Sequence, residues 1–381
     1  MKLVKRLLAT ILCGCLLGAP ALGIERVVFL DGKRHREVEG RLVVEAQDGG
    51  LLILAADGVM WAITPEQQIS RSSDDRPFRP LTADQLSKQL LAELPGTFRT
   101  YQTAHYLIFY DTSIGYAQWC GALFERLYAT FTNFWSKRGF PLQEPEFPLV
   151  AVIFAERADY LKFSRSELGE AAESIIGYYS LQTNRMMMYD LTGAEAALRR
   201  TARSSNATSI SQILSRPEAL RTVTTVIHEA VHQIAFNCGM HARFSDCPLW
   251  FSEGIAMYFE TPDLTSARGW RGVGAVNQAR LQQFNQYLRN RPANSLHTLI
   301  RDDTRFRDPK KALDAYAEAW ALTWFLLRQR SDQYIGYLKA LSAKKPLIED
   351  GPEKRIQQFE EHFGNIEQLE AELLRYISKM R

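Results

Sequence analysis

Short apolar runs separated by turn residues fill the chain between residues 24 and 70. The runs are rich in valine, isoleucine and leucine, and Asp31-Gly32, Asp48-Gly49 and Asp57-Gly58 stand between them. Asp-Gly between strand-like runs is typical of hairpin turns, because both residues tolerate a positive φ. Residues 24–70 are therefore predicted to form a small all-β, barrel-like module of four or five strands.

The hydrophobic pattern changes twice after this module. Residues 71–100 begin with a polar, proline-containing stretch, which predicts a linker followed by a connecting helix. Residues 101–381 then alternate between strand and helix patterns before they become mainly helical. Strands are predicted at 105–110, 147–154 and, around a turn at Thr183-Asn184, 177–190, with helices at 116–137 and 158–163. Strands followed by helices within one stretch of chain predict an α+β domain.

Residues 1–23 have the pattern of a secretory signal peptide. Three basic residues precede the apolar stretch Leu7–Leu17, and the small residues Ala21 and Gly23 follow it. The apolar stretch is well short of the ~20 residues that span a bilayer, so we expect cleavage before Ile24 and export to the periplasm or the medium. A retained N-terminal anchor and a lipoprotein anchor at Cys15 are the alternatives.

Composition and charge narrow the class of protein further. Hydrophobic residues make up 46% and charged residues 23% of the chain, which is typical of folded domains and excludes a disordered protein. The formal net charge is +3, and loss of the basic residues of the signal leaves the mature chain neutral. A neutral chain gives no electrostatic reason to expect nucleic acid or an anionic membrane surface as a partner.

Three of the five cysteines lie beyond the signal. Cys238 and Cys247 bracket a short loop and are candidates for a disulfide in an oxidising compartment. Cys120 lies in an apolar helical pattern and is predicted to be a buried free thiol.

The clearest chemical signal is the sequence His228-Glu229-Ala230-Val231-His232. It lies in a predicted helix that begins with a capping box at Ser215 and runs to Phe236. Residues four apart project from one helix face, so the two imidazoles can converge on one tetrahedral zinc. Glu229 points about 100° around the helix, where it reaches a metal-activated water as general base. A pair of surface histidines beside a solvated glutamate is the alternative, which the apolar flanks of the helix disfavour.

Glu253 is the candidate for the third metal ligand. The metzincin pattern needs histidine at position 238, where this chain has Cys238. Leu249–Glu260 is a second helix-like run, and two antiparallel helices joined by a loop can place Glu253 opposite the two histidines. Gly254 is small where this second helix has to approach its neighbour closely. His241, in the loop between the helices, is the competing ligand.

At these residues the chain resembles the gluzincin zinc metallopeptidases of the peptidase-MA-like clan, which includes thermolysin and the aminopeptidases related to leukotriene hydrolase. The run WFSEGIAMYFE is similar to the aminopeptidases' W-L-N-E-G-F-A-x-Y-x-E, and the resemblance covers residues 220–330. The nearest likeness is to a bacterial exported family known as domain of unknown function 1570. The resemblance implies one catalytic zinc held by His228, His232 and Glu253, with Glu229 as general base.

The resemblance also implies a role for Tyr316. The run Tyr316-Ala317-Glu318-Ala319 is similar to the Y-E-K-G element of the aminopeptidases, whose tyrosine donates a hydrogen bond to the tetrahedral oxyanion. A tyrosine at a helix start with its ring in the core is the alternative.

Two departures from the clan bear on the site. Thermolysin-like enzymes carry an aspartate four residues after the ligand glutamate, and Met257 stands there in this chain. Glu260, on the same helix face as Glu253, is therefore the candidate for a hydrogen-bond partner that supports a ligand from outside. Gly177–Ser180 lies where the aminopeptidases have G-x-M-E-N but lacks its glutamate, so an endopeptidase is expected, and the same strand offers an edge for an extended substrate.

The sequence thus favours an exported zinc-dependent endopeptidase that acts on peptide or protein substrates. Two alternatives stay open: a catalytically inactive peptidase-like binding protein of the cell envelope, and a zinc amidase that acts on cell-wall peptides. Retention of Glu229 favours an enzyme, because a binding site needs no base beside its metal. The β module is expected to be structural, or to dock to an envelope component or another domain.

Overall fold

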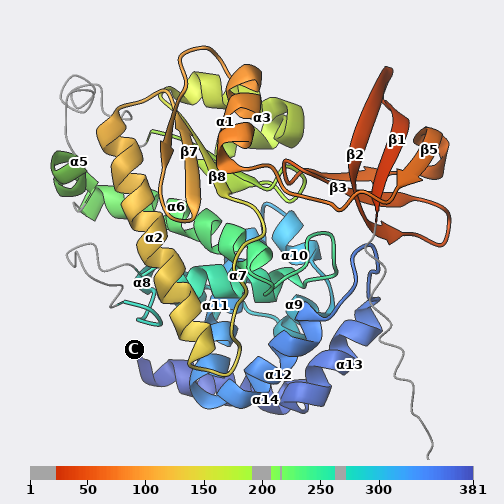
Figure 1. The fold of residues 1–381 in the computed structure, drawn as a ribbon. Coiled ribbons are helices and arrows are strands. Elements are labelled where there is room, and N and C mark those ends of the chain that lie inside the picture. The colour runs from red at the N-terminus through yellow and green to blue at the C-terminus, as the bar shows by residue number, and fades with distance from the viewer. Residues whose placement is uncertain (1–22, 191–206, 215–216, 262–271, 381) are drawn as a thin grey trace, which may run out of the picture. The chain divides into compact units, whose positions relative to one another are not determined.

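The computed structural model describes residues 23–190, 207–214, 217–261 and 272–380 (Figure 1). The chain divides into two units. Unit 1 comprises residues up to Leu54 together with Ala62–Arg79, and unit 2 comprises Ala55–Trp61 together with Pro80–Arg381. The signal-like segment up to residue 22 and the predicted capping residue Ser215 lie outside the described residues.

The first sheet has five strands, most of whose residues belong to unit 1, and it confirms the predicted all-β character of the N-terminal module. The strands run in the order β4-β3-β2-β1-β5, with β1 antiparallel to both of its neighbours. Gly32 turns the chain between β1 and β2 with a φ of 64°, as the Asp-Gly pattern predicts. The strands are β1 (Ile24–Asp31), β2 (Arg34–Glu45), β3 (Leu51–Ala55), β4 (Met60–Ile63) and β5 (Gln68–Asp74).

The prediction of a linker is wrong for residues 71–74, because β5 runs through them. The side chains of β5 are largely exposed, and its pairing with β1 comes from main-chain hydrogen bonds that a polar composition does not reveal. Arg71 adds ion pairs to Glu25 at 2.9 Å and to Glu45 at 3.0 Å. The predicted connecting helix follows as α1 (Ala83–Glu93).

A second sheet of five strands forms the scaffold of unit 2. In its order β6-β7-β8-β10-β9, the strands β7, β8 and β10 are parallel, and the edge strands β6 and β9 run antiparallel to their neighbours. Alternate side chains of β8 enter two separate cores, so its sequence LVAVIF is buried along its whole length. The strands are β6 (Arg99–Gln102), β7 (Tyr106–Tyr110), β8 (Leu149–Phe154), β9 (Gly177–Tyr179) and β10 (Arg185–Tyr189), and β7 to β10 correspond to the strands predicted from the sequence.

Helices cover both faces of this sheet. α2 (Ile114–Ser136) and α6 (Pro217–Asn237) pack on one face in the larger core, and α1 and α3 (Arg157–Leu168) pack on the other face in the smaller core. Gln233 fixes α6 to the sheet, because its Nε2 donates a hydrogen bond to the carbonyl oxygen of Val150 at 2.8 Å. The helix that carries the two candidate histidines is therefore held on a rigid support.

After β10 the described chain forms helices joined by loops, which confirms the α+β class. α7 (Leu249–Phe259) packs against both α6 and α11 (Ala312–Gln329). Gly254 faces α11, where an added Cβ would lie 2.0 Å from Thr323 Oγ1 and 3.0 Å from the Ala319 carbonyl oxygen. The small residue is thus required by α11 rather than by α6. The other helices are α5 (Ala207–Leu214), α8 (Gln278–Tyr287), α9 (Ser295–Arg301), α10 (Thr304–Arg307), α12 (Ser331–Ser342), α13 (Pro352–Phe363) and α14 (Ile366–Ile377).

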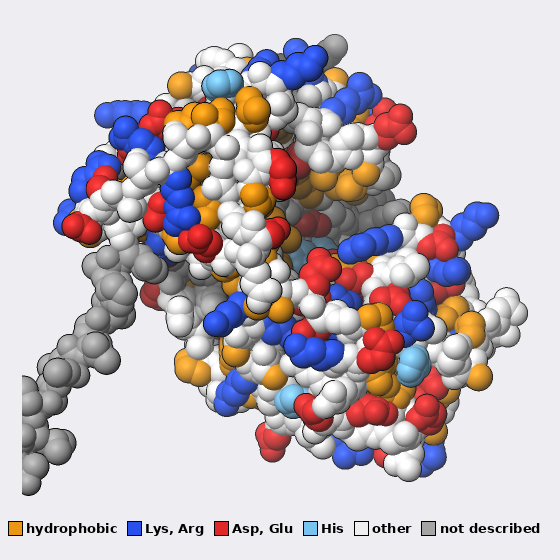
Figure 2. Space-filling model, turned by 90° about the vertical axis from the view of Figure 1, so that its right-hand side faces the viewer, with side chains coloured by type: hydrophobic (Ala, Val, Ile, Leu, Met, Phe, Trp, Pro, Cys, Tyr) orange, Lys and Arg blue, Asp and Glu red, His pale blue; other side chains and the backbone are white. Residues whose placement is uncertain are grey.

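Figure 2 shows lysine and arginine side chains intermingled with aspartate and glutamate on one face of the molecule. Among the helices that the structure describes, none is both long and apolar enough to cross a bilayer.

Candidate metal centre

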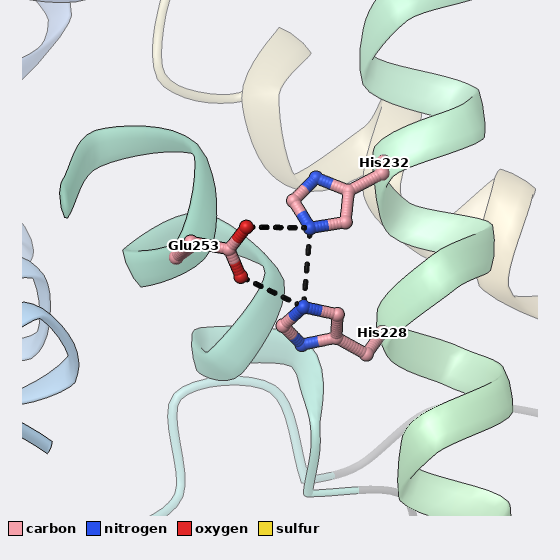
Figure 3. A group of neighbouring side chains, drawn as sticks. All are labelled: His228, His232 and Glu253. Atoms are coloured by element: carbon pink, nitrogen blue, oxygen red, sulfur yellow. Dashed lines mark hydrogen bonds and ion pairs between the residues drawn. The ribbon is translucent and has the colours of Figure 1, made fainter. Parts of the chain in front are cut away.

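Two neighbouring helices bring three potential metal ligands together. α6 carries His228 and His232 one turn apart, and α7 carries Glu253 opposite them (Figure 3). One ligand atom from each residue lies within 4.8 Å of the other two. The structure therefore assembles the three residues that the sequence singled out as ligands.

The spacing of these atoms suits a tetrahedral ion. His228 Nε2 lies 3.1 Å from His232 Nε2 and 2.9 Å from Glu253 Oε2, and His232 Nε2 lies 3.5 Å from Glu253 Oε1. Ligands bound at about 2.0–2.1 Å to a tetrahedral zinc are about 3.3 Å apart, because a tetrahedron's edge is about 1.6 times its bond length. Two nitrogens and one carboxylate oxygen are also the donor set of catalytic zinc sites, so the residues fit this metal.

The three side chains are largely buried: 13% of the His228 and Glu253 side chains and 12% of the His232 side chain is exposed. Burial favours the neutral form of Glu253, but the nearby His232 and His228 outweigh it and hold its pKa well below its usual range. Burial likewise opposes a charge on His228, but hydrogen bonds to Glu253 and Glu260 raise its pKa well above its ordinary value. Protons and a metal ion therefore compete for the same ligand atoms.

Glu260 supports His228 from the side away from Glu253. Glu260 Oε1 lies 2.8 Å from His228 Nδ1, so the carboxylate accepts a hydrogen bond that orients the ring with Nε2 toward Glu253. Burial favours the neutral form of Glu260, but the hydrogen bond from His228 and the charge of Arg280 lower its pKa to about 2. Glu260 thus lies where the sequence predicted an outer partner for a ligand.

Two further residues that the sequence pattern did not indicate hold Glu260. Asn277 donates to Glu260 Oε2 at 2.9 Å, and Arg280 Nη2 lies 3.2 Å from Glu260 Oε1. Asn277 is also the N-cap of α8, where its side chain accepts a hydrogen bond from the Arg280 main-chain N–H at 3.2 Å. An asparagine before a helical run predicts an N-cap from the sequence alone. The sequence does not predict that the same side chain also binds the Glu260 carboxylate, because that contact depends on the tertiary structure.

Glu229 lies beside the three ligands but contacts a different element. Its Oε2 accepts a hydrogen bond from the main-chain N–H of Tyr179 in β9 at 3.0 Å. Burial raises the pKa of Glu229, although the nearby His228 and His232 act in the opposite direction. The role of Tyr179 could not be predicted from the sequence, because its main-chain N–H is the donor and almost any residue type has that group.

Tyr316 lies near the start of α11, within the electrostatic influence of Glu253 and Glu229. The charge of Glu253 raises the pKa of Tyr316, and burial adds to the shift. The ring is half-buried and packs edge-on against Phe306, with 5.2 Å between ring centroids, and Arg280 Cζ lies 5.7 Å from the Tyr316 centroid. The predicted oxyanion donor is therefore near the site, while its ring is anchored in the surrounding packing.

Cys238 and Cys247 are free thiols, so the predicted disulfide between them is not formed. Cys238 is buried beside Tyr128, whereas Cys247 Sγ lies 3.6 Å from Nδ1 of His241. The two sulfurs thus face different partners, which their short separation in sequence did not reveal. His241 is buried, burial lowers its pKa to about 3, and it stands outside the ligand cluster found among the described residues. Cys120 is a buried free thiol, as predicted.

Fold and site together define an α+β protein with a candidate metal centre of two histidines and one glutamate. Residues 222–348 match a family described as Protein of unknown function (DUF1570). This segment, about a third of the chain, contains every residue predicted as ligand, base or oxyanion donor. The expected likeness to this family is thus confirmed for the segment. No curated protein matches the chain.

Proposed function

We propose that this protein is an exported zinc-dependent peptidase of the gluzincin type, with Glu229 as its general base. One observation carries the proposal: a half-buried glutamate, Glu229, lies beside the three ligands without belonging to their set, and a main-chain N–H donates a hydrogen bond to it. A structural metal site has no use for such a carboxylate, whereas hydrolysis of a peptide bond needs a base. The resemblance of WFSEGIAMYFE to the aminopeptidase sequence supports the same conclusion.

His228, His232 and Glu253 would hold the zinc. Two imidazoles and a carboxylate suit this metal, and three protein ligands are the number typical of catalytic zinc sites. When bound there, zinc polarises the scissile carbonyl and activates water for attack. Glu260 keeps the His228 ring in the tautomer and orientation that present Nε2 to the site.

Glu229 handles the proton in this proposal. Burial raises the pKa of its carboxyl group, which brings it closer to the range where a carboxylate can both take and release a proton at neutral pH. The Tyr179 N–H fixes one of its oxygens at 3.0 Å. Glu229 accepts the proton lost by the attacking water and passes it to the leaving amine.

The edge strand β9 supports an extended peptide as the substrate. β9 is the last strand of its sheet and pairs antiparallel with β10. Because Tyr179 of β9 donates to Glu229, this edge runs past the proposed base. A peptide that adds to the edge as a further strand would bring a main-chain carbonyl to the site, and an edge accepts the middle of a chain as readily as its end, which favours an endopeptidase.

We propose that the enzyme acts outside the cytoplasm, in the periplasm or the medium, because residues 1–23 have the pattern of a secretory signal peptide. Its substrates are then peptides or proteins of that compartment. We propose that the sheet of unit 1 docks to an envelope component or to another domain.

Zinc-dependent peptide hydrolysis tests the proposal. The mature protein should cleave members of a peptide library internally, lose this activity on dialysis against a chelator, and regain it when zinc is added back. Parallel assays with cell-wall muropeptides distinguish an amidase, which would cleave those substrates alone. Peptide binding without any cleavage by the zinc-loaded protein would contradict the proposal and favour an inactive binding protein.

Tyr316→Phe should lower kcat by roughly 10²-fold while zinc content and Tm stay unchanged. The substitution removes only the hydroxyl that would donate to the oxyanion, and it keeps the ring that packs on Phe306. Tyr376→Phe is the matched control, because that ring packs on Trp324 in a different part of the fold. Equal kcat values for Tyr316→Phe and the wild-type protein would leave Tyr316 with a packing role alone.

A further inference from the structure

A pair of side-chain amides ties the strand that contacts Glu229 to the helix that carries it. Asn184 Nδ2 donates to Asn237 Oδ1, and Asn237 Nδ2 donates to Asn184 Oδ1, both at 2.8 Å. Asn184 closes the turn between β9 and β10, and Asn237 is the last residue of α6. Two amides form both bonds at once only when their planes align, so this amide pair fixes an orientation as well as a distance.

Tyr179 connects the amide pair to Glu229. Its hydroxyl donates to Asn184 Oδ1 at 2.6 Å, and its ring stacks on Phe236 of α6 with centroids 5.9 Å apart. Its main-chain N–H donates to Glu229 Oε2 at 3.0 Å. Tyr179 is therefore fixed to α6 at two places along the helix, and the strand cannot slide or rotate without breaking one of these contacts.

The turn itself does not need this pairing. Asn184 has a φ of 61°, a left-handed conformation that asparagine tolerates and glycine adopts at no cost. Asn184 is nevertheless buried, with 4% of the residue exposed, and its main-chain carbonyl oxygen lies 3.4 Å from Gln233 Nε2 on α6. A turn at the surface would be served by glycine, so the buried amide points to a role beyond turn formation.

We propose that Asn184 and Asn237 are positioning residues for hydrolysis. The amide pair holds the Tyr179 N–H against Glu229 and so keeps the carboxylate aimed at the attacking water. Neither asparagine belongs to the ligand cluster, so both act through Tyr179. This inference rests on the proposed function, in which Glu229 is the base. A displacement of a reacting group by about 1 Å can cost about 10²-fold in rate, which sets the expected scale.

Asn237→Ala and Asn184→Gly remove the amide pair, and glycine keeps the left-handed turn. Both should lower kcat by about 10- to 100-fold with KM and zinc content unchanged. Both should also speed hydrogen exchange of the Tyr179 amide, measured by mass spectrometry with fragmentation. The control is Asn365→Ala, which removes the N-cap of α14, where Asn365 Oδ1 accepts a hydrogen bond from the Gln368 main-chain N–H at 3.0 Å. This substitution should change neither kcat nor the hydrogen exchange of the Tyr179 amide.

The exchange measurement is independent of activity and separates this inference from the proposed function. If Asn237→Ala lowers Tm as Asn365→Ala does but leaves kcat and Tyr179 exchange unchanged, the amide pair only stabilises the turn and the inference is overturned. A wild-type protein that hydrolyses nothing would count against the proposed function. Even in that case, faster hydrogen exchange of the Tyr179 amide in Asn237→Ala would support the positioning of Tyr179 against Glu229. Unchanged exchange of this amide would overturn the positioning role of the amide pair.

Discussion

Glu229→Gln is expected to keep its zinc and to lose hydrolysis. Glutamine has nearly the same size as glutamate, and its carbonyl oxygen can accept the same hydrogen bond from the Tyr179 N–H, so the fold and the ligands should not move. The amide cannot take a proton from water at neutral pH, so kcat should fall by between about 10² and 10⁴-fold. Steady-state kinetics together with metal analysis of the same preparation measures both quantities.

Glu253→Gln is the matched comparison for this variant, because the same chemical change is made at a proposed ligand. It should lose zinc as well as activity, since a neutral amide is a far poorer zinc ligand than a carboxylate. Hydrolysis at the wild-type rate by Glu229→Gln would remove Glu229 from the mechanism. Loss of zinc from Glu229→Gln would instead indicate that Glu229 is a zinc ligand.

Glu318→Ala should lower the free energy of unfolding by about 3–5 kcal/mol. Glu318 lies on α11 with no exposed surface, and its two oxygens accept hydrogen bonds from Arg291 Nη2 at 2.6 Å and Arg305 Nη1 at 2.7 Å. The side chains of Arg291 and Arg305 are only 6% and 10% exposed. Alanine would leave two buried guanidinium groups without this partner, and most of the loss in stability comes from such buried charges that have lost their counter-charge. Denaturant titration followed by tryptophan fluorescence measures the change.

Glu372→Ala serves as the control for burial. Glu372 pairs with Arg330 at 2.7 Å, but these side chains are 43% and 35% exposed, so the expected cost is about 0–1 kcal/mol. Equal effects of Glu318→Ala and Glu372→Ala would show that burial of the Glu318 network adds nothing to stability.

The ligand helix could be predicted from the sequence because its geometry is local. Residues four apart on a helix share a face, so His228 and His232 fix their relation without any knowledge of the rest of the fold. Glu253 needed a second helix and a resemblance to a known motif, and Glu260 followed from helical spacing along that same run. The strands of unit 2 were predictable because buried strands such as β8 are apolar throughout.

The contacts that surround the three ligands and Glu229 could not be predicted, because they join residues far apart in sequence or use main-chain atoms. The Tyr179 N–H bond and the amide pair depend on how β9 and α6 meet, and the Asn277 bond to Glu260 depends on how the end of α7 meets the start of α8. The disulfide prediction failed for the same reason: Cys238 and Cys247 are close in sequence, but their surroundings direct the sulfurs to different partners. The polar strand β5 was missed because an exposed edge strand owes its pairing to main-chain hydrogen bonds rather than to apolar side chains.

The zinc content of the purified mature protein, measured beside that of His232→Ala, is the decisive measurement for the proposed metal centre. The two Nε2 atoms and the Glu253 carboxylate are spaced for one tetrahedral ion, so we expect one zinc per chain in the wild-type protein. Loss of one of the three ligands in His232→Ala should abolish that binding. Absence of zinc from both proteins, even after zinc is added back, would rule out the proposed zinc site and leave a metal-free protein with a peptidase-like arrangement of side chains.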